Sequence, residues 1–270
     1  MLDQYTLIWN TNYKYLIILD ACRYDYFEKV YREFPELRQG KLYKVISSGS
    51  STAEWLEKIF QGQECKDIVY ISANPYINSK GIPYLGFNPG PIVSRFYKVI
   101  DVWNWGWDEE LGIVHPREVN KATLIAIRLY PNKRFIIHYL QPHYPYLDLV
   151  SKGVRLYTLR DRVEGFIRWR IVDLLGKKWG LKLANKLVGP PPNEVSLVAR
   201  RVGVEGLRKA YETNLRVVLE HVVRLLNNLH GRIIITSDHG DLLGEHGMYG
   251  HLSGKNFPEL IQVPWLEISR

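Results

Sequence analysis

The 270-residue sequence is poor in cysteine and has no long apolar run. Its two cysteines, Cys22 and Cys65, are too few for a disulfide framework, and nothing in the sequence indicates that they pair. No apolar run reaches the roughly 18 residues that a membrane span requires. Residues 1–4, and the polar and aromatic residues after them, lack the pattern of a signal peptide. We therefore expect a cytoplasmic protein whose membrane contact, if it has any, is peripheral and at the inner membrane surface.

Composition and charge bound the domain organisation. Hydrophobic residues make up 46% of the chain, which is ordinary for a globular protein with a core. The net charge of +8 is concentrated in one segment. Residues 151–209 contain fourteen Lys and Arg against five Asp and Glu, whereas the rest of the chain contains twenty-two against twenty-three. We therefore predict a single domain over residues 1–270 that carries a helical, basic insertion or cap at 151–209.

Short apolar runs alternate with stretches of helical periodicity. The runs predicted to be strands are Tyr13–Asp20, Lys41–Ile46, Asp67–Ala73, Phe96–Val102, Arg134–Leu140, Ile233–Thr236 and, as an edge strand, Val263–Ile268. The stretches predicted to be helices are Tyr26–Phe34, Ala53–Phe60, Pro116–Leu129 and Gly206–Leu229. This alternation predicts an α/β fold, an αβα sandwich around a mostly parallel central sheet.

The stretch Gly231–His251 contains polar residues of the kind that bind metals. The β-branched run Ile233–Thr236 reads as a strand buried on both faces, and Asp238 and His239 follow it, where open α/β sheets bind their ligands. Twelve residues after His239, His251 lies in a Gly-rich loop that can fold back over the same place. A carboxylate with two imidazoles is typical of a Zn²⁺ or Mn²⁺ site. The alternative is a solvated turn at the end of a strand.

Two earlier segments supply the groups that such a site would still need. Asp20 ends the first predicted strand and offers a second carboxylate, or else it caps the helix that follows. Arg23, just beyond it, can bind an anion. Three hydroxyl residues, Ser50, Ser51 and Thr52, open a predicted helix. A hydroxyl there is either an N-cap or a nucleophile beside free backbone N–H groups that can hold a phosphate or sulfate.

Together, Asp20 at a strand end, a hydroxyl that opens a helix and the late motif Ser237–Gly240 resemble the alkaline phosphatase superfamily. The resemblance is closest to its sulfatase-like and phosphoethanolamine or phosphoglycerol transferase branches. It extends over nearly the whole chain except 151–209, and the SDHG…GE…GH pattern is its most specific part. It implies an alkaline phosphatase-like fold and metal-dependent attack on ester substrates.

The resemblance also selects a nucleophile. In sulfatase-like members the nucleophile opens a helix that closes with a glycine ten residues later, and Thr52 and Gly62 have that spacing. This selects Thr52 over Ser50 and Ser51. In the sulfatases proper the nucleophile is a modified cysteine within Cys-x-Pro-Ser-Arg. Neither cysteine of this chain has that context, so formylglycine chemistry is not expected.

The H-x4-H-x-P-Y pattern that begins at His138 resembles the segment by which the transferase branch brings a substrate-side histidine, here His143, to its site. By this resemblance His143 and His251 would hold a second metal or the phosphoryl oxygens; the alternative for His143 is a turn residue between prolines. His138 itself is interpreted as a core residue. Tyr139 stands where the nucleotide pyrophosphatase branch has an acid. A complete second site is therefore not expected, and Asp148 is the only nearby substitute.

These residues lead to one predicted mechanism. One Zn²⁺ or Mn²⁺ is bound, and a second ion is possible. The predicted ligands of the first ion are Asp20, Thr52 Oγ1, Asp238 and His239. Thr52 attacks the phosphorus of a phosphomonoester or phosphodiester in line, and water or an acceptor hydroxyl resolves the phosphothreonine. His143 and His251 bind the second ion or act as acid and anion holders, and Arg23 stabilises charge.

Other functions and partners stay open at this point. The competing functions are sulfate ester hydrolysis without formylglycine, phosphomutase chemistry, and non-catalytic binding of acidic lipid or glycan through residues 151–209. That segment suits an anionic membrane surface or an acidic glycan, or it is a solvated cap. No nucleic-acid motif accompanies it, so nucleic acid is not an expected partner. The sequence leaves substrate, acceptor and oligomeric state open.

Two loop features have more than one interpretation. The aromatic loop 103–115, with Trp103, Trp105 and Trp107, is interpreted as a cover of the core rather than the wall of a pocket. Asn74, which precedes a proline, is either a turn former or a polar residue of the site.

Overall fold

A computed structural model describes residues 2–154 and 193–270. Between these ranges it describes only Ile167, Arg170, Ile171, Leu174, Leu175, Lys182, Leu183, Lys186 and Leu187. About half of the predicted insertion at 151–209 therefore lies outside the described residues, and the membrane or glycan contacts expected of it stay predictions. Among the described residues, no helix is both long and apolar enough to cross a membrane.

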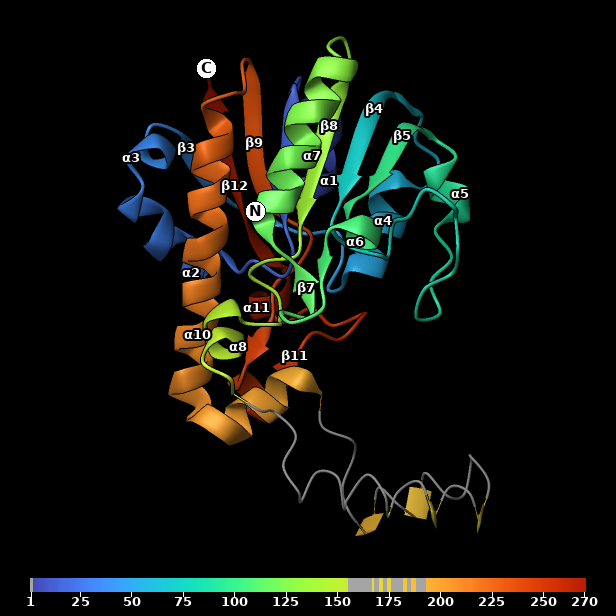
Figure 1. The fold of residues 1–270 in the computed structure, drawn as a ribbon, viewed down its shortest axis with the longest axis vertical. Coiled ribbons are helices and arrows are strands. Elements are labelled where there is room, and N and C mark those ends of the chain that lie inside the picture. Colours follow the sequence, from blue (N-terminus) through green and yellow to red (C-terminus); the bar gives the residue numbers. More distant parts are fainter. Residues whose placement is uncertain are drawn as a thin grey trace.

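One mixed sheet forms the centre of the described part of the chain (Figure 1). Its strands are β1 (Leu2–Asp3), β2 (Tyr15–Leu19), β3 (Lys41–Ile46), β4 (Cys65–Ser72), β5 (Phe96–Asp101), β8 (Arg134–Tyr139), β9 (Arg232–Ser237) and β12 (Gln262–Ser269), in the spatial order β1-β3-β12-β9-β2-β8-β4-β5. β12 is antiparallel to both of its neighbours, and the other pairings are parallel. The mostly parallel sheet is thus confirmed. The prediction of an edge strand at Val263–Ile268 is wrong, because β12 pairs along both sides.

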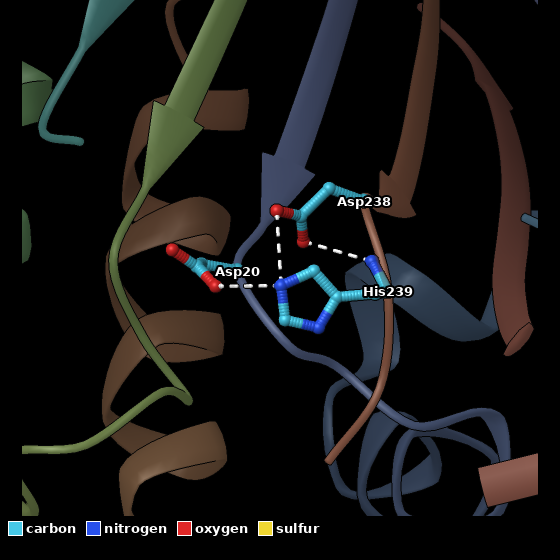
Figure 2. Close-up of side chains that lie close together, drawn as sticks. All are labelled: Asp20, Asp238 and His239. Atoms are coloured by element: carbon cyan, nitrogen blue, oxygen red, sulfur yellow. Dashed lines mark hydrogen bonds and ion pairs between the residues drawn. The ribbon is translucent and has the colours of Figure 1, made fainter. Parts of the chain in front are cut away.

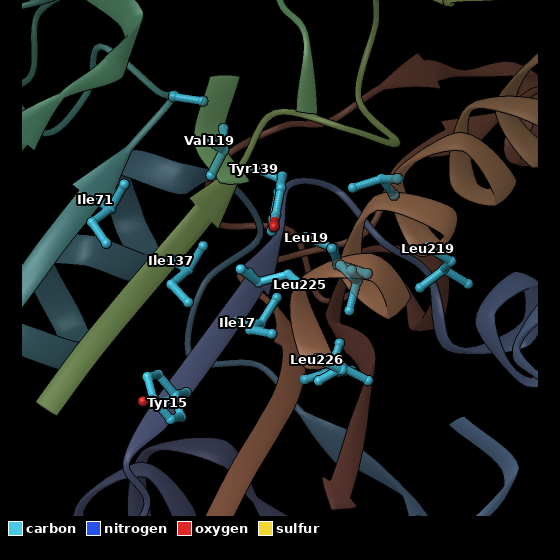
Figure 3. Close-up of a cluster of buried hydrophobic side chains, with 14 of the residues drawn as sticks. Tyr15, Ile17, Leu19, Ile71, Val119, Ile137, Tyr139, Leu219, Leu225 and Leu226 are labelled. Atoms are coloured by element: carbon cyan, nitrogen blue, oxygen red, sulfur yellow. The ribbon is translucent and has the colours of Figure 1, made fainter. Parts of the chain in front are cut away.

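Helices cover both faces of this sheet, so its central strands are apolar on both faces. The first face is covered by α2 (Tyr24–Val30), α7 (Pro116–Leu129) and α10 (Glu194–Leu226), and the second by α1 (Gln4–Asn10), α4 (Thr52–Phe60) and α5 (Gly90–Val93). Along β2, Tyr15, Ile17 and Leu19 enter the core under the first face (Figure 3), whereas Leu16 and Ile18 enter the core under the second. This alternation is the two-residue period of a strand. The αβα sandwich is confirmed.

The remaining elements are short. They are η1 (Tyr31–Glu33), α3 (Pro35–Arg38), α6 (Val102–Trp105), β6 (Trp107–Asp108), β7 (Ile113–Val114), α8 (Leu147–Ser151), β10 (Leu242–Leu243), η2 (Glu245–Gly247), β11 (Tyr249–Gly250) and α11 (Pro258–Ile261). The helix predicted at Gly206–Leu229 begins earlier, as α10, and kinks at Gly203, whose φ of 76° suits glycine. The capping role considered for Asp20 is not seen, because the N-cap residue of α2 is Arg23.

The carboxyl ends of β2, β4, β8 and β9 lie at one edge of the sheet because these strands are parallel neighbours. Open α/β sheets bind their ligands at this edge. The segments that follow these strands contain Asp20, Asn74, His143 and Asp238. The fold therefore gathers polar residues that are far apart in the sequence.

Candidate metal centre and active-site cleft

Asp20 and Asp238 lie side by side because they follow two paired strands. Leu19 at the end of β2 is in register with Ser237 at the end of β9, so the next residue of each strand faces the same space. His239 follows directly. These three side chains are buried, and one ligand atom from each lies within 4.8 Å of the others (Figure 2). The structure thus brings together three of the four predicted ligands of the first ion, and the fourth, Thr52, lies beside them.

Only one of the two carboxylate oxygens of Asp20 accepts a hydrogen bond. Its Oδ2 accepts a hydrogen bond from Asn74 Nδ2 at 2.7 Å. Its Oδ1 is buried without a hydrogen-bond partner and lies 3.6 Å from His239 Nε2. A buried carboxylate oxygen that lacks a donor is costly unless a cation or proton meets it. Asn74 is therefore a residue of the site as well as a turn former.

Asp238 is held by donors from three segments. Its Oδ1 accepts from the backbone N–H groups of Ala21, at 3.1 Å, and His239, at 2.9 Å. Its Oδ2 accepts from Thr52 Oγ1 at 2.7 Å. Ala21 adopts a φ of 59°, which is uncommon for a residue with a Cβ. The backbone after β2 is thus held in a sparsely populated conformation that directs an N–H group at the carboxylate.

His239 presents an unprotonated nitrogen to the two acids. Its Nδ1 lies 2.8 Å from the carbonyl oxygen of Gly240 and must donate to it. Nε2 therefore carries a lone pair in the neutral ring, and it lies 3.5 Å from Asp238 Oδ2. Burial lowers the pKa of His239 to about 4, so the ring is neutral at pH 7. A lone pair that faces two carboxylates is the arrangement expected of a histidine ligand to a metal.

The pKa values of the two buried carboxyl groups are shifted in opposite directions. Burial raises the pKa of Asp20 well above its usual value, and the neighbouring Asp238 raises it further. Burial also acts on Asp238, but His239, His138 and its hydrogen-bond donors outweigh it and hold the pKa of that carboxyl low. In the absence of a cation, a shared proton therefore resides on Asp20. A divalent cation would allow both groups to be ionised and would release that proton. The donor set and the unpartnered Oδ1 fit a divalent ion.

Thr52 is the one hydroxyl of its triplet that contacts the acids. Ser51 is the N-cap of α4 and accepts from Glu54 N. Ser50 Oγ lies within 2.9 Å of both Glu54 Oε2 and the carbonyl oxygen of Leu252, either of which can accept its one hydrogen. Thr52 begins the helix, and its Oγ1 lies 3.3 Å from His239 Nε2 in addition to its bond with Asp238. The capping role therefore belongs to Ser51, and Thr52 Oγ1 faces the ligand atoms.

A second cluster adjoins the first. The ring of His251 lies 4.4 Å from that of His239 and 5.2 Å from that of His143, between centroids. His251 Nδ1 lies 3.3 Å from Asp241 Oδ1. Asp241 is fully buried, and its Oδ2 has no hydrogen-bond partner. The structure therefore brings both predicted histidines to the site and adds a carboxylate that the sequence analysis missed. The available signal was an acid two residues after His239 in the run SDHGD.

Other predicted residues lie elsewhere. Asp148 pairs with Lys152 at 2.7 Å on α8, and Tyr139 donates to Asn120, so neither supplies the second carboxylate. His138 is a core residue, as predicted, but its Nε2 lies 3.8 Å from Asp238 Oδ2 and has no hydrogen-bond partner. It therefore packs beneath the acid centre.

Arg23 is not free to stabilise charge on a substrate. Its guanidinium is buried and donates to the carboxylates of Asp25, at 2.7 and 3.0 Å, and Glu245, at 2.9 Å. It also donates to the carbonyl of Asp241 at 3.3 Å. The role predicted for Arg23 is corrected: its donors hold the loop after β9 against the start of α2.

A cleft of about 420 Å³ opens beside the acid centre. Its lining residues are Asp20, Thr52, Asn74, Pro75, Tyr76, Tyr84, Leu85, Trp107, Gly112, Ile113, Leu140, His143, Tyr144, Pro145, Glu194 and His251. The core interpretation of the aromatic loop holds for Trp103, which packs on the core, but not for Trp107, which lines the cleft. Periodicity in the sequence cannot distinguish the two tryptophans, because α6 and β6, which contain them, are too short to show a period.

At Gly240 the loop after β9 passes close to α11, and its N–H group donates to the carbonyl oxygen of Leu260 at 2.7 Å. A Cβ built there would lie 2.0 Å from the carbonyl oxygen of Glu259. We expect Gly240→Ala to lower the free energy of unfolding by about 1–3 kcal/mol, as overpacking does, in urea denaturation of the metal-free protein. The control is Gly254→Asn, whose φ of 73° suits asparagine and whose added Cβ meets nothing within 4 Å. Equal unfolding midpoints for the two variants would contradict this account.

Comparison with solved structures finds proteins of the same fold. The chain is similar to the C-terminal periplasmic domain of phosphoethanolamine transferase EptC from Campylobacter jejuni, with 15% identity, a TM-score of 0.56 and coverage of 94% of this chain and 78% of that one. For the Escherichia coli EptC domain in complex with Zn, the identity is 12%, the TM-score 0.52 and the coverage 99% and 74%. For the phosphonate monoester hydrolase of Agrobacterium radiobacter, the identity is 14% and the TM-score 0.54, and the match covers 94% of this chain and 67% of that one.

No protein-family model and no curated protein matches the chain. The similar structures include phosphoethanolamine transferase domains, phosphonate monoester hydrolases and a sulfatase-like protein, and these proteins belong to the alkaline phosphatase superfamily. The predicted resemblance is therefore confirmed at the level of the fold, and the chain has an alkaline phosphatase-like fold.

Proposed function

We propose that this protein is a metal-dependent hydrolase or transferase of phosphate esters, with Thr52 as its nucleophile. The observation that carries the proposal is the convergence of Thr52 Oγ1, His239 Nε2 and the unpartnered Asp20 Oδ1 beside Asp238. A hydroxyl, two carboxylates and a neutral imidazole are more than a packed core requires. The fold that the chain shares with phosphoethanolamine transferases and phosphonate monoester hydrolases supports it.

Asp20, Asp238, His239 and Thr52 would hold the ion. A bound divalent ion lowers the pKa of a hydroxyl that ligates it and so makes the oxygen nucleophilic. Zn²⁺ is favoured by the imidazole ligand, and the similar EptC domain from Escherichia coli contains Zn. Mn²⁺ is the alternative with the same ligand types.

The residues of the chain perform the rest of the chemistry. Asp238 accepts the hydrogen bond of Thr52 and fixes the position of Oγ1. Oγ1 gives its proton to Asp238 Oδ2, which already accepts its hydrogen bond, and forms a bond with phosphorus while the bond to the ester oxygen breaks. A monoester then leaves phosphothreonine, and a diester leaves an ester of phosphothreonine. His143 and His251 line the same cleft and hold the phosphoryl oxygens or supply the proton that the departing oxygen takes. Water or an acceptor hydroxyl then breaks the phosphothreonine bond.

His251 and Asp241 should act as a pair. We expect His251→Ala to lower the kcat for bis(p-nitrophenyl) phosphate about 100-fold. Asp241→Asn, which weakens the orientation of the ring, is expected to lower it about tenfold. Steady-state rates check both values, with the metal content per chain measured in parallel. The control is His246→Asn in the same loop, because His246 is 45% exposed and stacks on Phe257. Unchanged rates for His251→Ala would contradict its role.

Turnover of different esters tests the reaction class. The metal-stripped protein is assayed on p-nitrophenyl phosphate, bis(p-nitrophenyl) phosphate and p-nitrophenyl sulfate before and after Zn²⁺ or Mn²⁺ is added back. We expect metal-dependent hydrolysis of phosphate esters. Faster hydrolysis of the sulfate would indicate a sulfate esterase, and no turnover with any ion would favour a binding protein.

A further inference from the structure

The cleft beside Thr52 has an apolar wall built by two loops. After β4, the chain forms a small turn in which Tyr84 and Phe87 exchange two backbone hydrogen bonds of 2.9 Å, with Leu85 at its tip. Tyr76 packs edge-on against Tyr84, with ring centroids 5.2 Å apart. After β5, the β6–β7 ribbon presents Trp107. Tyr76, Tyr84, Leu85 and Trp107 all line the cleft.

This wall is open to solvent rather than part of the core. Leu85 is 77% exposed, Trp107 43% and Tyr84 39%. Neighbouring apolar side chains that stay exposed beside polar groups commonly mark a ligand surface. The wall adjoins Asp20 and Thr52 within one cleft, so a substrate group attached to a phosphorus at Thr52 has this surface within reach.

The charges of the cleft disfavour a doubly charged substrate. Among the described residues that line it, none is Lys or Arg, and Glu194 adds a carboxylate. The buried Arg23 is bound to Asp25 and Glu245. At neutral pH a phosphomonoester is largely a dianion, whereas a phosphodiester is a monoanion. Two carboxylates of the acid centre already balance the charge of one divalent ion, so among these lining residues only the imidazoles of His143 and His251 are left to meet the second charge of a monoester.

We infer that this cleft selects phosphodiester monoanions over phosphomonoester dianions and packs one apolar, ring-containing ester substituent against Leu85 and Trp107. The inference rests on the proposed function for the site at which the phosphorus binds. It assigns substrate selection to loops that follow β4 and β5, outside the metal centre. Trp107 and Leu85 are specificity residues in this account.

Binding of unreactive phosphates tests the wall without requiring turnover. Titration calorimetry on the metal-loaded full chain compares diphenyl phosphate, dimethyl phosphate and phenyl phosphate. We expect diphenyl phosphate to bind about tenfold more tightly than the other two, since a buried ring removes apolar surface from water. Trp107→Ala and Leu85→Ala should each reduce that preference to about threefold. Trp105→Ala is the matched control, because Trp105 lies on the same loop and is 53% exposed but does not line the cleft.

Turnover separates failure of this inference from failure of the proposed function. We expect bis(p-nitrophenyl) phosphate to be hydrolysed with a kcat/KM at least about tenfold above that of p-nitrophenyl phosphate. Turnover that favours the monoester, with equal binding of diphenyl and dimethyl phosphate, would overturn the inference and leave the hydrolase intact. A phenyl preference that Trp107→Ala and Trp105→Ala weaken equally would also overturn it. If Trp107→Ala and Leu85→Ala lose the preference for diphenyl phosphate, Trp105→Ala keeps it and no ester is turned over, the apolar wall binds the ring as inferred. The proposed hydrolase or transferase function would then be wrong.

Discussion

Thr52→Ala is expected to lower the turnover of bis(p-nitrophenyl) phosphate by at least about 1,000-fold, because the proposed reaction has no other route to a covalent intermediate. The same change also removes a metal ligand. Thr52→Ser keeps the hydroxyl and should retain measurable activity. In the parent protein, rapid acid quenching followed by mass spectrometry should find a p-nitrophenyl phosphoryl group on Thr52, because attack on the diester releases only one of its two p-nitrophenolates.

Ser51→Ala is the matched control for this experiment. Ser51 is the N-cap of α4, so its loss should lower the free energy of unfolding by about 1 kcal/mol and leave kcat nearly unchanged. This comparison separates damage to the helix start from loss of the nucleophile. If Thr52→Ala is as active as the parent, Thr52 is not the nucleophile, and Ser50 and Ser51 become the candidates.

Removal of the metal should have the second large effect. In the proposed metal centre, two buried carboxylates and a neutral imidazole come together only in the folded chain, so an ion bound there would stabilise that state. At a free concentration 100 times the Kd the gain is about 2.7 kcal/mol, which corresponds to a rise in Tm of about 5–10 °C for a chain of this size. Calorimetry with and without Zn²⁺ or Mn²⁺ measures it. Asp20→Asn should remove this rise and abolish turnover.

Asp20→Asn should have a different effect on the metal-free protein. Burial and the neighbouring Asp238 raise the pKa of Asp20 above 3.8, the usual pKa of this carboxyl group. The protonated group therefore contributes to the free energy of unfolding at low pH, and this contribution is lost as the pH rises above 3.8 toward the raised pKa. Asparagine keeps the shape and carries no charge. The metal-free variant should therefore gain stability relative to the parent as the pH increases from 5 to 8, in urea denaturation. A difference that is constant with pH would contradict the proposed coupling of the two acids.

The sequence alone predicted a mostly parallel sheet, most of its strands and most residues of the candidate metal centre. A buried parallel strand is apolar throughout, so the polar residue that ends it is conspicuous, and Asp20, Asp238 and His239 were found in this way. Because parallel strands end at a common edge, the sequence also predicts that these three residues lie close together. The selection of Thr52 over its two neighbours needed the resemblance to a family. Spacing along a helix start does not show which hydroxyl caps it.

Only the tertiary structure decided what depends on loop paths and on partners distant in the chain. Asp241 becomes the partner of His251 because the loop after β9 folds back. The guanidinium of Arg23 is bound to Asp25 and Glu245 instead of facing a substrate. Trp107 lines a cleft while Trp103 packs on the core, although they are four residues apart. β12 sits within the sheet because it pairs on both sides. Periodicity records the burial of a regular element, whereas the direction of a loop side chain depends on contacts that no local pattern encodes.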